Sequence, residues 1–201
     1  MSEKGDLDPL LAALSDLVDW FAAEKVSGVI IGGVAASILG RPRLTRDVDV
    51  LVLLQEARWP EFLACGEAQG FVPRRSDVLA FARETRVLLL RHQQSGIDVD
   101  LVFGSLPFED QAVARATWID FEGVMIPLPS PEDLIIMKAV AHRPRDLEDI
   151  EALLATQPDL NIRRVRSWVK EFAAALDRPD ILADLENPLA RHRRRRKSSK
   201  N

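Results

Sequence analysis

GGVAASILGRPRLTRDVDV, which spans residues 32–50, is the stretch of sequence that decides the fold. A short apolar strand, residues 28–32, precedes it, and an Ala- and Leu-rich helix follows the glycines and ends at Gly40. Residues 47–54 alternate acidic and apolar side chains and then become wholly apolar, which predicts a central strand. The Gly-Gly turn is either a simple tight turn or an anion site, because glycine lets the backbone approach a ligand and a helix N-terminus offers free N–H groups.

Asp47 and Asp49 lie two residues apart on this strand, so their carboxylates share one face. Adjacent like charges repel unless a cation neutralises them. Hard oxygen ligands select Mg²⁺ or Mn²⁺, and Mg²⁺ usually fills its remaining positions with phosphate oxygens and water. A lone Asp-x-Asp pair would favour a simpler interpretation, an acid exposed at a strand edge.

The sequence IDVDLV, residues 97–102, repeats this acidic pattern. It forms the second half of a predicted hairpin, residues 86–92 and 97–103, joined by QQSG. If the sheet aligns the two acidic strands, three or four carboxylates surround one or two metal ions, as phosphoryl transfer requires. Asp100 lies deeper in the apolar run and is the expected third ligand, whereas Asp98, nearer the turn, is expected behind the ligands or in solvent.

The rest of the chain predicts an α+β protein, with a small mixed sheet flanked by helices and a helical C-terminal part. We expect the sheet core over residues 1–128, the helical part over 129–188 and a basic, disordered tail over 189–201. Further helices are expected at 9–23, 59–69, 108–116, 131–142, 145–155, 161–176 and 179–186, with a β-ribbon at 118–128.

Composition excludes several classes of protein. The chain has 201 residues and one cysteine, so it cannot form an internal disulfide. It has no apolar run near the ~20 residues of a membrane span, and we expect a cytoplasmic protein without a membrane partner. Seven of its 27 basic residues lie in the last eleven positions, where there is no acid. That tail could contact nucleic-acid phosphates or fold back on the acidic body.

Together these motifs resemble the nucleotidyltransferases of the DNA polymerase β superfamily. The fit is closer to the small bacterial toxin-type nucleotidyltransferases of the AbiEii/AbiGii group, because Gly32-Gly33 is followed by R-x-T-x-D-x-D at residues 43–49. Two later segments of that group appear here as PEDLIIMK, residues 131–138, and RDLED, residues 145–149. The resemblance spans residues 28–154.

The resemblance implies a role for each matching residue. Gly32 and Gly33 would contact a nucleoside triphosphate (NTP). Asp47 and Asp49 would hold Mg²⁺, and Asp100 would complete the site and help to deprotonate an acceptor hydroxyl.

Other matching residues would act around the phosphates. Lys138 would reach a phosphate, and Asp146 and Asp149 could orient Lys138 or Arg43, or simply favour the start of a helix. Arg43 and Thr45 could contact phosphate or hold the loop, with the structural role favoured for Thr45.

The implied activity is transfer of a nucleoside monophosphate (NMP) from an NTP to a hydroxyl of RNA or a tRNA end, of a protein or of a small molecule. A toxin of this group would have an antitoxin partner. The alternative is a catalytically inactive member that binds nucleotide or a partner. Two features depart from the superfamily: the second glycine is followed by VAAS rather than directly by serine, and the chain has no tyrosine, so a stacking aromatic would have to be Phe or Trp, such as Phe103 or Trp118.

Overall fold

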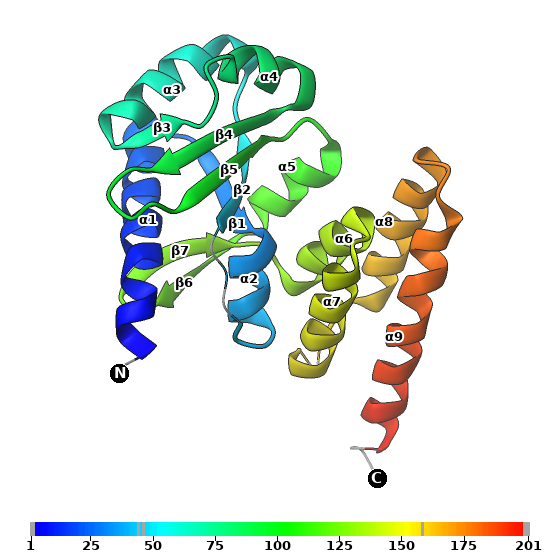
Figure 1. The fold of residues 1–201 in the computed structure, drawn as a ribbon. Helices are drawn as coiled ribbons and strands as arrows, with labels where there is room; N and C mark the ends of the chain where they lie inside the picture. Colours follow the sequence, from blue (N-terminus) through cyan, green and yellow to red (C-terminus); the bar gives the residue numbers. More distant parts are fainter. Residues whose placement is uncertain (1–2, 44, 46, 158, 199–201) are drawn as a thin grey trace. The chain divides into compact units, whose positions relative to one another are not determined.

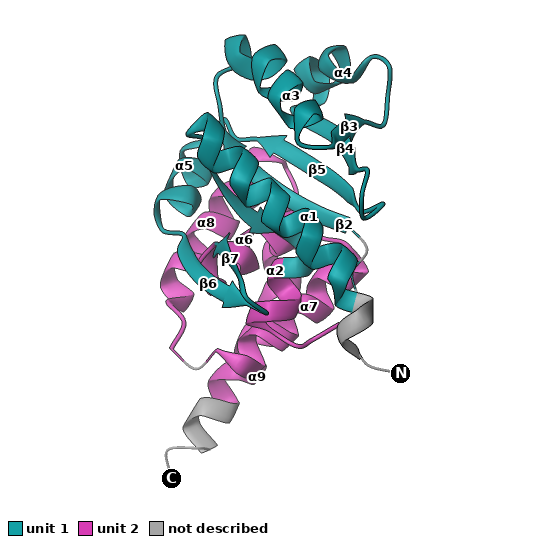
Figure 2. Cartoon of the chain, turned by 90° about the vertical axis from the view of Figure 1, so that its left-hand side faces the viewer, with its two compact units in different colours: residues 1–34, 44–128 teal, residues 35–43, 129–201 magenta. Residues whose placement is uncertain are grey.

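The computed structural model describes residues 3–43, 45, 47–157 and 159–198, with side chains described within residues 7–194. The chain forms two compact units (Figure 2). Unit 1 contains Met1–Val34 and Leu44–Leu128, and unit 2 contains Ala35–Arg43 and Pro129–Asn201. The change of unit after Leu128 coincides with the expected start of the helical part, but residues 35–43 also belong to that second unit.

A five-stranded mixed sheet forms the centre of unit 1 (Figure 1). Its spatial order is β1-β2-β5-β4-β3, with β2 and β5 parallel and the other neighbours antiparallel. The antiparallel pairing of β4 with β5 confirms the predicted hairpin. The strands are β1 (Ser27–Ile31), β2 (Asp47–Leu53), β3 (Phe71–Pro73), β4 (Val87–His92) and β5 (Asp98–Phe103).

Helices and a separate hairpin surround this sheet. Figures 1 and 2 show α1 along one side of it, where Phe21 packs against Gly28 of β1. The predicted ribbon at 118–128 is the two-stranded sheet of β6 and β7. The elements are α1 (Glu3–Glu24), the 3₁₀ turn η1 (Glu56–Arg58), α3 (Trp59–Ala68), α4 (Val78–Thr85), α5 (Pro107–Ala114), β6 (Thr117–Phe121) and β7 (Val124–Leu128).

An aromatic cluster joins α1 to α3 and β3. The Trp20 ring stacks on Phe62 at 4.2 Å and on Phe71 at 5.2 Å between ring centroids. Gly66 of α3 faces the same indole, and a Cβ there would lie 2.4 Å from a Trp20 ring carbon. Because a larger side chain has no room, this glycine sets how closely α3 packs on α1.

Residues 71–85 contain two elements that sequence periodicity did not predict, β3 and α4. β3 has three residues and α4 has eight, so neither is long enough for a clear repeat. β3 exists because its backbone pairs with β4, which is a tertiary effect. Arg74, which follows β3 directly, continues this pairing, since its N–H donates to the Leu89 carbonyl at 3.0 Å.

Unit 2 is helical. Its N-terminal contribution is residues 35–39 of α2 (Gly32–Leu39), and the other helices follow residue 129. Ser130 caps α6 as its sequence indicated, because its Oγ accepts the Asp133 N–H at 3.1 Å. The fully buried Asp133 carboxylate accepts two hydrogen bonds from the Arg164 guanidinium of α8, at 3.1 and 2.8 Å. The helices are α6 (Pro131–Ala141), α7 (Pro144–Thr156), α8 (Ile162–Ala175) and α9 (Pro179–Ser198).

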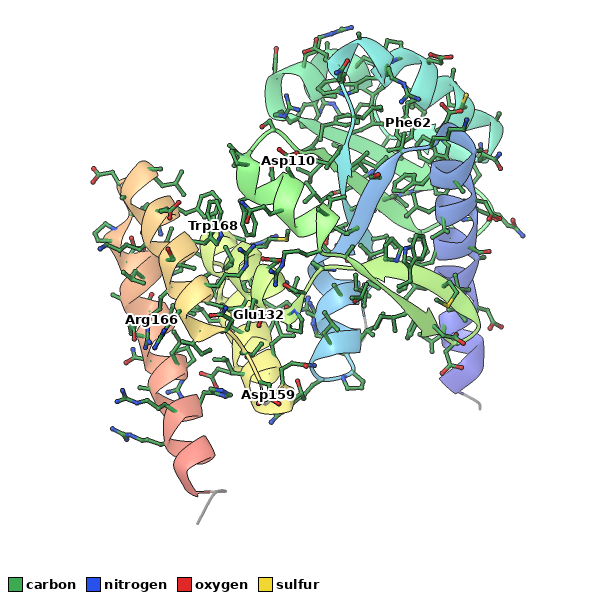
Figure 3. All side chains as sticks on the ribbon, turned by 180° about the vertical axis from the view of Figure 1, so that it is seen from behind. Phe62, Asp110, Glu132, Asp159, Arg166 and Trp168 are labelled. Atoms are coloured by element: carbon green, nitrogen blue, oxygen red, sulfur yellow. The ribbon has the colours of Figure 1, made fainter. Side chains whose placement is uncertain are left out.

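The C-terminal segment differs from the expected disorder, because α9 continues from Pro179 to Ser198. One face of α9 is buried at positions spaced by four and three residues: Leu185, Leu189 and His192. This face packs on the other helices of unit 2. Arg166 of α8 adds two hydrogen bonds to the Glu186 carboxylate of α9, at 2.7 and 2.8 Å (Figure 3). The many arginines of this segment favoured disorder by composition, and composition does not register the spacing of the few apolar residues among them. Residues 199–201 of the expected tail lie outside the described residues.

Within the described part of the chain, no helix combines the length and apolarity needed to cross a membrane.

Candidate active site

Strand register brings the four predicted acids together on one face of the sheet. Asp47 is the register partner of Asp98, and Asp49 is the partner of Asp100. The residues that alternate with them are fully buried on the opposite face, which fixes the acids on the more open one. These buried residues are Val48, Val50, Val99 and Leu101.

Gly32 lies against this acidic face, at the turn from β1 into α2. Its φ of +62° is a conformation that glycine adopts freely. A Cβ at this position would lie 1.9 Å from Asp49 Oδ2 and 2.7 Å from Asp49 Cβ. The sequence left open a simple tight turn or an anion site at these glycines. In the structure, the group that leaves no room for a larger residue at position 32 is the Asp49 side chain. Gly33 follows in the first turn of α2.

Thr45 holds the first carboxylate. Its hydroxyl donates to Asp47 Oδ1 at 2.9 Å, just before β2 begins. This contact agrees with the structural role favoured for Thr45.

Arg74 is a site residue that sequence reasoning missed. Its guanidinium donates to Asp98 Oδ2 at 3.0 Å and also to Asp100 Oδ1. Arg91 of β4 donates to the other Asp98 oxygen at 2.7 Å. The only sequence signal was an Arg-Arg pair at positions 74 and 75, which does not distinguish a site from a surface.

The two acids of β5 have opposite electrostatic surroundings. The hydrogen bond from Arg91 is the main cause that lowers the pKa of Asp98. Burial raises the pKa of Asp100, and repulsion from Asp49, Asp47 and Asp98 adds to it, although Arg74 acts in the other direction. An added cation would therefore relieve Asp100 more than Asp98.

The donor set fits a hard divalent cation by its chemistry. In the described residues, no group of three or more His, Cys, Asp or Glu side chains is arranged as a metal centre. Nevertheless, oxygen donors lie side by side in register, Gly32 makes room for Asp49, and the Arg74 guanidinium serves as a cation for Asp100. Asp47, Asp49 and Asp100 thus remain the candidate ligands.

Lys138 lies in unit 2, within a buried charged network. Its Nζ donates to Asp146 Oδ1 at 2.9 Å and to Asp149 Oδ2 at 2.8 Å. Arg43 binds the same Asp149 carboxylate through two nitrogens, at 3.0 and 3.1 Å. Asp146 also accepts the Arg143 N–H at the start of α7. Both roles considered for the two acids therefore occur together, holding cations and capping a helix.

Charge within this network favours the ionised form of Asp149. Burial opposes ionisation, but hydrogen bonds from Arg43 and Lys138 outweigh it and lower the pKa of Asp149. Arg43 is also anchored through its backbone, since its N–H donates to Ser37 Oγ at 3.0 Å.

The two aromatic candidates for base stacking differ in exposure. Phe103 is buried and stacks on Trp59 at 4.0 Å, which makes it a core residue. Trp118 on β6 is 57% exposed.

Comparison with protein families assigns the chain to one family. The family described as "Nucleotidyl transferase AbiEii toxin, Type IV TA system" matches residues 13–199. The chain belongs to this AbiEii family. It is therefore a nucleotidyltransferase, as the glycine turn and paired Asp-x-Asp strands predicted. Comparison with curated proteins gave no match.

Solved structures share the fold of this AbiEii-family chain. An antigenic nucleotidyltransferase-like protein from Paracoccidioides brasiliensis has 18% identity and a TM-score of 0.53, over 88% of this chain and 92% of that one. The antibiotic-resistance factor ANT(2'')-Ia has 15% identity and a TM-score of 0.56, over 90% and 98% of the two chains. Its complex with adenylyl-2''-tobramycin has 16% identity and a TM-score of 0.55, over 83% and 98%. These likenesses confirm the mixed α+β fold.

Proposed function

We propose that this protein is a Mg²⁺- or Mn²⁺-dependent enzyme that transfers NMP from an NTP to an acceptor hydroxyl and releases pyrophosphate. The observation that carries the proposal is the register of Asp49 with Asp100 on parallel strands, beside the glycine turn that opens α2. Carboxylates and a helix N-terminus are the groups that a metal-bound triphosphate needs.

Asp47, Asp49 and Asp100 would hold the metal, and Thr45 would orient Asp47. The bound metal would supply positive charge to the reacting phosphate oxygens. Gly33 and the N–H groups that follow in the first turn of α2 would face phosphate. The acceptor oxygen forms a bond to the α-phosphorus while the bond to the bridging oxygen of pyrophosphate breaks.

The proton of the acceptor hydroxyl would pass to Asp100. This is the role that the resemblance implies for Asp100, whose carboxylate lies in register with Asp49. Asp98 would remain behind the ligands, because Arg91 and Arg74 both bind its carboxylate.

Lys138 would bind a phosphate with its ammonium. An ammonium has three donors, and Asp146 and Asp149 accept two of them. The third donor would go to phosphate, while the two carboxylates hold the direction of the side chain. Arg43 would act through Asp149 in the same network.

The acceptor would be an RNA or tRNA end, a protein or a small molecule, and the family's toxin–antitoxin character implies an antitoxin partner. The solved complex of ANT(2'')-Ia with adenylyl-2''-tobramycin supports including a small molecule among these classes.

Transfer of label from each α-labelled NTP, with Mg²⁺ or Mn²⁺, to total RNA, cell protein or small-molecule acceptors tests the activity. Asp47→Asn combined with Asp49→Asn should abolish transfer and leave the protein folded, whereas the exposed Asp19→Asn on α1 should transfer as the wild type does. Transfer by the double variant would place the metal site elsewhere. Nucleotide binding with no transfer to any acceptor would favour the alternative, an inactive nucleotide-binding or partner-binding member.

A further inference from the structure

Arg74 is a cation that directly contacts the proposed metal ligand Asp100 within unit 1. It bridges the two acids of β5, with one nitrogen on Asp98 at 3.0 Å and another on Asp100. A guanidinium suits this arrangement, because its planar fork can bind two carboxylates at once.

Sheet register explains how Arg74 reaches these acids. Asp49, Asp100 and Leu89 are successive register partners across β2, β5 and β4, and partners share a face. Arg74 extends this row, because its N–H binds the Leu89 carbonyl. Its long side chain then crosses Leu89 to the carboxylates. The contact depends on the pairing of three strands, β3, β4 and β5, and is built into the sheet.

We propose that Arg74 is an internal counter-ion that competes with the divalent metal for Asp100 and thereby sets the metal affinity of the site. The inference rests on the proposed metal-dependent function. Metal binding breaks the contact of Arg74 with Asp100 and leaves its contact with Asp98, so the guanidinium stays beside the site.

The partial exposure of this pair to solvent makes the exchange feasible. The side chains of Arg74 and Asp100 are 26% and 35% exposed. Ion pairs in contact with water are weak, so a divalent cation can displace a single guanidinium. The contact nevertheless matters before metal binds, because it offsets repulsion among four adjacent carboxylates.

Neighbouring arginines provide matched controls. Arg75 is adjacent in sequence but binds Asp77, at 2.9 and 2.8 Å. Arg91 binds Asp98 and is therefore expected to orient an acid that is not a metal ligand. Removing Arg75 changes the net charge of the protein equally without touching the acids of β5.

The test is Mn²⁺ binding to the whole protein without nucleotide, by isothermal titration calorimetry at fixed ionic strength. Arg74→Gln should bind Mn²⁺ roughly threefold to tenfold more tightly than the wild type, the effect of one partly exposed charged contact. Arg75→Gln should stay within about twofold of the wild type. The Mn²⁺ affinity of Arg74→Lys should lie between those of the wild type and Arg74→Gln, because one ammonium is a point charge that does not match the fork of a guanidinium.

Each outcome bears on one claim. Equal or weaker Mn²⁺ binding by folded Arg74→Gln overturns the role of Arg74 and leaves the metal site standing. Absence of Mn²⁺ binding in the wild type and in both Arg74 variants overturns the metal site and, with it, the inference. Circular dichroism checks folding, and if Arg74→Gln does not fold, Arg74→Lys decides: affinity no higher than wild type refutes the proposal.

Discussion

Gly32→Ala should disable the acidic site, and the structure gives the size of the effect. The new methyl carbon would lie 1.9 Å from Asp49 Oδ2, whereas ordinary contact begins at 3.4 Å. The oxygen would therefore have to retreat by about 1.5 Å. Rotating the Asp49 side chain does not suffice, because Asp49 Cβ itself would be 2.7 Å away. The backbone of the turn or of β2 must move.

Gly32→Ala carries two separate costs, one in the stability of the protein and one in the rate of transfer. A positive φ costs a non-glycine residue about 1–2 kcal/mol, which lowers the stability of the protein. Misplacing a catalytic group by about 1 Å costs about 100-fold in rate, or about 2.7 kcal/mol of barrier. Gly123→Ala is the matched control, since Gly123 has a φ of +91° and its Cβ would meet nothing within 4 Å. It should lose stability without losing activity.

The assay is kcat/KM for transfer from an α-labelled NTP, combined with urea unfolding of each variant. We expect Gly32→Ala to lose at least about 100-fold in kcat/KM and Gly123→Ala to remain near the wild type. Transfer by Gly32→Ala within about tenfold of the wild type would falsify the argument that this glycine makes room for Asp49. An equal loss of activity in Gly123→Ala would show that backbone strain alone was responsible.

Three further predictions concern stability. Lys138→Met should lower the free energy of unfolding, measured in urea, by about 1–3 kcal/mol, because Asp146 and Asp149 each lose a buried charged partner and each keep one arginine. An unchanged free energy of unfolding would contradict this. The pKa of Asp149 is lowered on folding. The ionised carboxylate therefore stabilises the protein fully above the unfolded pKa of about 4, and this stabilisation is lost as pH falls through the folded pKa. Asp149→Asn should flatten the acid limb of a plot of stability against pH, and an unchanged slope would refute the assignment. Gly66→Ala should destabilise unit 1 by about 1–3 kcal/mol in thermal unfolding, because its Cβ would meet the Trp20 ring at 2.4 Å; an unchanged melting temperature would show that α3 can shift freely.

Local patterns were sufficient to locate the acids and the glycine turn. Alternation of Asp with Val places Asp47 and Asp49 on one face of a strand, and Asp98 and Asp100 follow the same rule. Alternation is a property of neighbouring residues and needs no knowledge of the fold. The glycine pair was visible to local reasoning as a turn between a strand and a helix, whereas the positive φ of Gly32 and the space that Asp49 needs there came only from the structure.

Contacts between distant segments could not be predicted in this way. β3 is too short for periodicity, and without β3 nothing places Arg74 in the row that contains Asp100. The resemblance named Asp146 and Asp149 as possible partners of Lys138 or Arg43, but only the packing of α6 on α7 decided that Lys138 binds both carboxylates. The apolar face of α9 was hidden by the arginine run, because composition averages over the positions that packing separates.

The sequence by itself determined which residues carry charge, which face of each strand they occupy and where a glycine turn joins a strand to a helix. Only the tertiary structure decided which cation meets which carboxylate. The physical reason is the distance along the chain over which each effect acts. Alternation and turn geometry involve a few neighbouring residues. The ion pair of Arg74 with Asp100 joins residues that are 26 positions apart and depends on how the strands pair.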